Sequence, residues 1–98
     1  MPDIGITNIR IVPASSADQD HGLLAFASIT INGLVIDGIT VRRTLDDRVV
    51  LDFPKRTDRA GRQRSIVHPA DDSVRAEITR AVLTAIDPSL IATAGADP

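Results

Sequence analysis

Two β-rich segments separated by the dipeptide Asn32-Gly33 constrain the fold more than any other feature of the sequence. Residues 23–31 and 34–41 are rich in Ile, Val, Leu and Thr, and β-branched side chains pack well on the pleated surface of a strand. Asn and Gly adopt the positive φ angles that a two-residue type I′ turn requires. The sequence therefore predicts an antiparallel hairpin, and Gly38 predicts a β-bulge in its second strand.

Three more strands are predicted outside this hairpin, at residues 5–12, 48–53 and 62–67. The first two are apolar, β-branched segments that stop at a proline, which lacks the N–H donor that a strand ladder needs. Residues 14–22 are small and polar, and we expect a loop there. If 48–53 and 62–67 pair, the residues between them form the tip of a second hairpin.

After residue 70 the spacing of apolar residues becomes helical, with one stripe formed by Val74, Ile78, Ala81, Val82, Ala85 and Ile86. Residues 71–73 all suit an N-cap, and Asp87-Pro88 ends the helix. These elements predict an α+β domain at residues 1–87, with one C-terminal helix packed on a small antiparallel sheet of about five strands. Residues 88–98 are expected to form a flexible tail.

The core must be aliphatic, because Phe26 and Phe53 are the only aromatic residues. Both lie in predicted strands, where we expect the core to bury them, and this disfavours the stacking of bases on exposed rings. A small aliphatic core is marginally stable. We therefore expect a second copy of the chain to cover a sheet edge or face, giving a homodimer.

The chain lacks the residue patterns of several other classes of protein. It has no cysteine, which excludes disulfides, thiolate metal sites and cysteine nucleophiles. It has no phosphate-binding loop with its lysine, no metal-ligand spacing and no Ser-His-Asp arrangement, so we expect neither an enzyme nor a cofactor, a metal or a small-molecule substrate. Without a signal peptide or a long apolar run, we expect a cytoplasmic protein with no membrane partner.

Positive charge is concentrated between residues 42 and 64. This segment carries eight of the eleven Lys and Arg residues and four Asp residues, a net charge of +4 in a chain whose total is −2. At its centre, residues 55–64 hold five cations and one carboxylate. Guanidinium groups present forked donors that match phosphate oxygens, and Gly61 lets a ligand approach the backbone closely. Residues 55–64 are the candidate site.

Two interpretations of this segment stay open. It either binds phosphates, with Thr57 and Gln63 as additional neutral donors, or it is a solvated hairpin tip whose arginines pair with Asp52 and Asp58. A neighbouring group of cations extends the positive surface only if Asp46-Asp47 does not neutralise it: Arg42, Arg43 and Arg48.

Several segments together give the chain a family resemblance: Ala27-Ser28-Ile29-Thr30-Ile31, residues 34–41, Pro54-Lys55-Arg56-Thr57 with Ile66-Val67-His68-Pro69, and Arg75 with Ala81-Val82-Leu83. In their order and near-matching spacing, these segments resemble the SpoVG family of bacterial septation and gene-regulatory proteins. The resemblance implies a small antiparallel sheet followed by a C-terminal helix, a dimer, and binding of DNA, and in some members RNA, through basic residues around the Pro-Lys-Arg-Thr motif. It also implies roles in septum formation, sporulation and the regulation of transcripts.

The chain also departs from the family pattern. No small residue separates Pro54 from Lys55, the turn at residues 58–61 replaces a Pro-Asp-Gly turn, and Glu77 stands where lysine is common. Acids that are frequent in the family are replaced by Arg62 and Ser65, so this loop is more basic than usual.

By position, Lys55, Arg56 and Arg64 match cations of the family motif, and Arg75 matches one at the start of the helix. We therefore expect a DNA- or RNA-binding regulatory protein whose contacts are Lys55, Arg56, Thr57, Arg59, Arg62, Arg64 and Arg75. The alternative is a protein-interaction adaptor in cell division or regulation that docks an acidic partner through the same basic loop.

Overall fold

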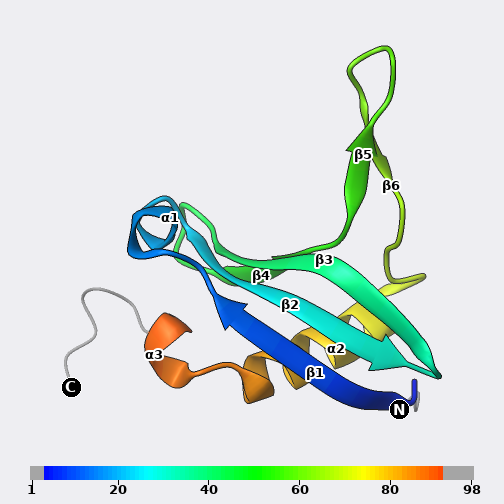
Figure 1. The fold of residues 1–98 in the computed structure, drawn as a ribbon, viewed down its shortest axis with the longest axis horizontal. Coiled ribbons are helices and arrows are strands. Elements are labelled where there is room, and N and C mark those ends of the chain that lie inside the picture. The colour runs from blue at the N-terminus through cyan, green and yellow to red at the C-terminus, as the bar shows by residue number, and fades with distance from the viewer. Residues whose placement is uncertain (1–3, 92–98) are drawn as a thin grey trace.

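The computed structural model describes residues 4–91, which contain a four-stranded antiparallel sheet, a two-stranded hairpin and three helices (Figure 1). Asn32 and Gly33, with φ angles of 50° and 83°, form the turn of the hairpin predicted at residues 23–41, which is confirmed. The strands predicted at 5–12 and 48–53 are also confirmed. Each strand of the sheet pairs with the next in sequence: β1 (Ile6–Pro13), β2 (Leu23–Ile31), β3 (Leu34–Arg43) and β4 (Val49–Asp52).

A β-bulge interrupts the pairing of β2 with β3. The register shifts between Ala27 and Ile29, so Asp37 and Gly38 both lie opposite the single residue Ser28. Gly38 has a φ of 81°, a left-handed conformation that glycine adopts without strain. The bulge predicted at Gly38 is confirmed.

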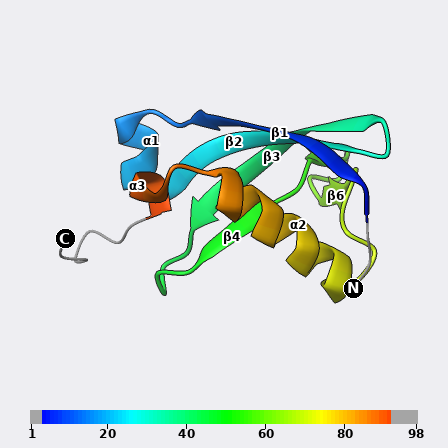
Figure 2. The same ribbon diagram turned by 90° about the horizontal axis from the view of Figure 1, so that it is seen from below.

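Helix α2 (Asp72–Ala85) covers one face of the main sheet (Figure 2). Its N-cap is Asp71, whose side chain accepts a hydrogen bond of 3.0 Å from the N–H of Val74. The predicted helix, its cap and its packing on the sheet are confirmed. The core contains buried residues of both layers: Leu24, Ala25, Ala27, Ile29, Ile39, Val41, Leu51, Phe53, Ile78, Val82 and Ile86.

The predicted loop at residues 14–22 contains a short helix, α1 (Ser16–Asp20), so that prediction is wrong over these residues. The hydroxyl of Ser15 caps the helix by accepting a hydrogen bond of 3.1 Å from the N–H of Asp18. A serine cap is a local signal for a helix, but the small, polar composition of the segment favoured the prediction of a loop.

A third helix, α3 (Pro88–Ile91), follows α2, so the described residues contain three helices where one is predicted. Proline suits the first turn of a helix, and Leu90 and Ile91 pack against the core. Residues 92–98 of the predicted tail lie outside the described residues. Within residues 4–91, no helix has the length and apolar character needed to cross a membrane.

Strands β5 (Lys55–Thr57) and β6 (Gln63–Ser65) form a separate two-stranded sheet. This hairpin projects from the main sheet on the side opposite α2 (Figures 1 and 2). The strand predicted at residues 62–67 is thus present in part, at Gln63–Ser65, and it pairs with β5 rather than with 48–53. Strand β5 lies between the predicted strands 48–53 and 62–67, where the sequence predicts only the tip of a hairpin. The chain reverses direction after Thr57, so residues 55–57 are free to form a strand.

Phe26 lies on the face of the main sheet that α2 leaves open. Its neighbours on β2, Ala25 and Ala27, are buried in the core, whereas Phe26 is 43% exposed. The prediction that the core buries Phe26 is wrong, because successive side chains of a strand point to opposite faces. Phe53 is buried, as predicted.

Candidate nucleic-acid interface

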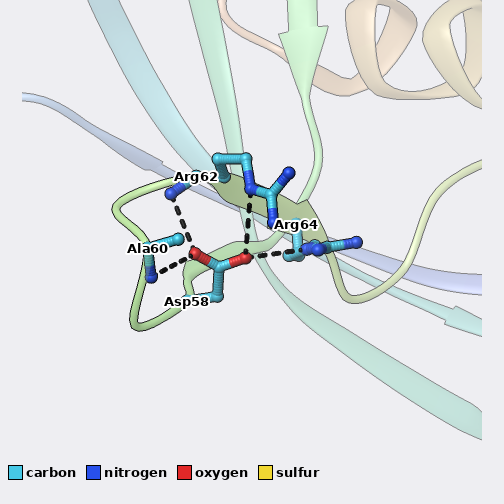
Figure 3. Close-up of polar contacts among 4 residues, drawn as sticks. All are labelled: Asp58, Ala60, Arg62 and Arg64. Atoms are coloured by element: carbon cyan, nitrogen blue, oxygen red, sulfur yellow. Dashed lines mark hydrogen bonds and ion pairs between the residues drawn. The ribbon is translucent and has the colours of Figure 1, made fainter.

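A tight turn at residues 58–61 closes the β5–β6 hairpin (Figure 3). Oδ1 of Asp58 accepts hydrogen bonds of 2.9 Å from the backbone N–H groups of Ala60 and Arg62. The N–H of Gly61, a residue with a φ of 82°, donates to the Asp58 carbonyl at 3.0 Å. The Asp58 carboxylate therefore holds the turn that places Arg59 at the tip of the projection.

The strand register sorts the side chains of the hairpin onto two faces. Arg56 pairs with Arg64, and residues two apart on a strand share a face, so Asp58 and Arg62 lie on the same side as this pair. We call this side the arginine face: Arg56, Asp58, Arg62 and Arg64. The opposite side, the polar face, carries Lys55, Thr57, Gln63 and Ser65.

Asp58 is the carboxylate of the arginine face, and two arginines share it. Its Oδ2 lies 2.9 Å from Nε of Arg64 and 3.8 Å from Nε of Arg62 (Figure 3). The hydrogen bond from Arg64, followed by that from the Arg62 N–H, lowers the pKa of Asp58 below its ordinary value. The side chains of Arg62 and Arg64 are nevertheless 72% and 61% exposed, so both keep donors for a ligand.

Three further cations of the hairpin have no such partner. Lys55, Arg56 and Arg59 are exposed, and none of their side chains makes an ion pair or hydrogen bond within the part of the chain that the structure describes. Residues 55–64 therefore carry five cations against one carboxylate on a solvent-exposed projection.

The cations at the end of β3 and the start of β4 are arranged differently, because each has a carboxylate of its own. The pairs are Arg42 with Asp52 at 3.6 Å, Arg43 with Asp47 at 2.8 Å, and Arg48 with Asp46 at 3.1 Å. These cations therefore do not extend the hairpin surface as one unpaired patch.

Among residues 4–91, no group of three His, Asp or Glu residues is placed to hold a metal ion.

Arg75 is the one predicted contact that lies outside the hairpin. It belongs to α2, on the other side of the main sheet, and its guanidinium carbon lies 5.4 Å from the centroid of the Phe53 ring. Phe53 precedes Pro54 at the base of the hairpin, so Arg75 packs beneath this base. The structure brings the other six predicted residues together on β5, β6 and their turn.

The open face of the main sheet adds candidate residues that sequence reasoning missed. Arg10 and Val12 of β1, and Phe26 of β2, are exposed there beside Asp37 of the bulge. The signal that identifies Arg10 and Phe26 is alternation, because each stands between buried or half-buried residues of its strand. Val12 is the residue of β1 that pairs with Phe26.

Comparison with protein families gives a match to the SpoVG model over residues 4–87, which is most of the chain. The chain belongs to the SpoVG family. The matched region of this SpoVG-family chain contains the main sheet, the whole hairpin and α2. No curated protein matches the chain.

Proposed function

We propose that this SpoVG-family protein binds nucleic acid, DNA or RNA, by holding phosphates with the β5–β6 hairpin. The observation that carries this proposal is the set of three exposed cations, Lys55, Arg56 and Arg59, that have no partner within residues 4–91. Cations without an internal carboxylate exchange only water and counterions for a phosphate, so their charge is available for binding.

The geometry of the hairpin supports a phosphate ligand. Arg56 and Arg64 are cross-strand neighbours, so their forked donors can contact the same phosphate or adjacent phosphates. Thr57 lies on the polar face with Lys55 and adds a neutral donor there. Such contacts position a nucleic acid without reading its sequence. We place Arg75 as a secondary contact at the base of the hairpin.

A homodimer and a regulatory role in septation or transcript control complete the proposal. Two copies present two hairpins, which doubles the phosphate contacts and steepens the salt dependence of binding. The edge strands β1 and β4 of the main sheet offer surfaces for the second copy. Light scattering measures directly whether the protein is a dimer.

The test compares two double variants with the same loss of charge. Arg56→Gln with Arg59→Gln removes two unpaired hairpin cations, while Arg42→Gln with Arg48→Gln removes two paired cations of the main sheet. Binding of a fluorescent duplex and of a single-stranded RNA is titrated against salt. For the hairpin variant we expect weaker binding and a log–log slope that falls by about 1.8 for duplex DNA, from about 0.9 for each lost contact.

The control variant should keep most of the affinity and slope of the wild-type protein. If the hairpin variant folds and binds as wild type does, the proposed site is wrong. If neither wild type nor variant binds DNA or RNA at moderate salt, and a protein partner resists nuclease treatment, the adaptor hypothesis replaces the proposal.

A further inference from the structure

The open face of the main sheet contains a shallow depression of about 310 Å³. This volume lies at the low end of the range of ligand sites, roughly 300 to 1,000 Å³, and gives room for one small ring system. β1, β2 and the bulge of β3 line the depression: Arg10, Val12, Phe26, Ala27, Ser28, Asp37 and Gly38.

An exposed aromatic ring and two charged side chains meet in this depression. Phe26 is 43% exposed and its cross-strand neighbour Val12 is 57% exposed, so both present apolar surface to solvent. Arg10 and Asp37 add a donor and an acceptor, and neither forms an ion pair within residues 4–91. An apolar ring with polar groups at its rim fits a flat heteroaromatic ligand that carries hydrogen-bonding edges.

The depression adjoins the base of the hairpin. A methyl group placed on Gly38 would lie 3.4 Å from Cγ of Pro54, so the bulge and the residue that precedes β5 are in contact distance. The N–H of Ile66 donates to the Pro54 carbonyl at 3.0 Å and closes the hairpin at this point. The hairpin also projects on the same side of the main sheet as the open face (Figures 1 and 2). One ligand can therefore reach both surfaces.

We propose that the depression holds an unpaired base of a single-stranded nucleic acid, which stacks on Phe26 while Arg10 and Asp37 contact its edges. This inference rests on the proposed function, because the phosphates next to that base are the ones that the hairpin binds. Proteins that bind single strands combine a cationic track for the backbone with aromatic rings for the bases. The +4 hairpin supplies the track and Phe26 supplies the ring.

The charged residues favour a base over a second copy of the chain as the occupant. The central part of a protein–protein interface is depleted of charged residues, whereas Arg10 and Asp37 both line the depression that contains Phe26. The edges of a base offer donors to Asp37 and acceptors to Arg10. The neighbouring cations also favour an anionic ligand.

The first experiment separates stacking from phosphate binding. Phe26→Leu keeps an apolar side chain of similar reach and removes the π face. We expect binding of a short single-stranded RNA or DNA to weaken about 5- to 150-fold, the range for loss of one stacked base, with an unchanged salt slope. Duplex binding should change little, because paired bases are not free to stack.

The second experiment observes the stacked base directly. The chain has no tryptophan, so Phe26→Trp introduces a single fluorophore into the depression. Its emission should be quenched as single-stranded RNA is added and should stay constant with a duplex. Leu45→Trp, at a fully exposed position of the β3–β4 loop, is the matched control and should not respond.

The outcomes distinguish this inference from the proposed function. If Phe26→Leu binds single strands as tightly as wild type while the hairpin variant loses affinity, the base site is wrong and the phosphate site stands. If Phe26→Leu alters the oligomeric state in light scattering, the open face is an interface between copies and the base site is again wrong. If the hairpin variant also binds normally, both proposals fail.

Discussion

The two groups of cations between residues 42 and 64 are close in sequence but differ in how they are paired. At the β3–β4 end, Arg42, Arg43 and Arg48 each lie within 3.6 Å of a separate carboxylate. On the hairpin, residues 55–64 hold five cations and a single carboxylate, Asp58, which pairs only with Arg62 and Arg64. A local count of charges therefore does not define a binding surface. The number of carboxylates within reach of the cations does.

The difference arises from the turns that join the strands. In the β3–β4 turn, Asp47 takes a φ of 66° and the Thr44 hydroxyl accepts a hydrogen bond of 3.0 Å from the N–H of Arg48. Its acids pair with the arginines beside them. The hairpin turn uses glycine at the left-handed position, Gly61, and needs one carboxylate. The residues of each turn thus determine how many of the nearby Lys and Arg side chains have a carboxylate partner.

The largest expected effect comes from making the hairpin resemble the β3–β4 end. Arg62→Asp removes one cation and gives the remaining arginines of the face a second carboxylate, while the backbone bonds of the turn remain. We expect nucleic-acid affinity to fall about 10- to 100-fold, because a charged hydrogen bond is worth roughly tenfold or more. Fluorescence anisotropy at fixed salt measures this loss.

The matched control is Arg48→Asp, which makes the same change in net charge at a cation that is already paired with Asp46. Its affinity should fall less than threefold, as expected for a small change in screened, distant charge. Equal losses in the two variants would show that total charge, and not the hairpin, governs binding.

A smaller difference in binding affinity is expected between Arg56 and Arg64, two arginines of the arginine face. Arg56 has no partner within residues 4–91, whereas Arg64 donates to Asp58 at 2.9 Å. Arg56→Gln should therefore weaken binding about tenfold, and Arg64→Gln by a smaller factor, because Arg64 must leave an internal hydrogen bond to contact a phosphate. Titrations of both variants with one oligonucleotide give the order. A greater loss for Arg64→Gln would contradict it.

Local features of the fold are predictable from the sequence. The turn at Asn32-Gly33, the bulge at Gly38 and the cap at Asp71 each depend on the conformational preference of one or two residues. The same holds for the apolar stripe of α2. The family was recognisable from segments of this kind, in order along the chain, and the family comparison confirms it.

Features that depend on pairing across the chain are not predictable in this way. The sequence places Asp52 as a potential partner of hairpin arginines, but the register of β3 with β4 brings it to Arg42. Similarly, the sequence predicts residues 62–67 as one strand of a five-stranded sheet. The turn at Asp58 instead pairs this strand with β5 in a separate sheet. The location of Phe26 was predictable from alternation, and the expectation that aromatic residues are buried was wrong there.

The smallest expected effect concerns the ionisation of Asp58 and Asp46, each of which has a lowered pKa for a different reason. A hydrogen bond from Arg64 is the main cause at Asp58, whereas the Thr44 hydroxyl is the main cause at Asp46. Because the folded pKa is lowered, each interaction stabilises the fold above the unfolded value of about 3.9 and is lost as pH falls through the folded value. Both turns should therefore loosen only in acid and stay unchanged near neutrality.

Removing one arginine from each turn sharpens the comparison. Arg64→Gln should raise the pKa of Asp58 towards its ordinary value, since the main cause of the shift is removed. Arg48→Gln should raise the pKa of Asp46 less, since the Thr44 hydroxyl remains. Carboxyl carbon chemical shifts measured against pH give both values, and Asp58→Asn assigns the hairpin signal by removing it. Equal changes at the two sites would mean that the arginines act through long-range charge and that the direct hydrogen bond of Arg64 has no special part in holding Asp58 ionised.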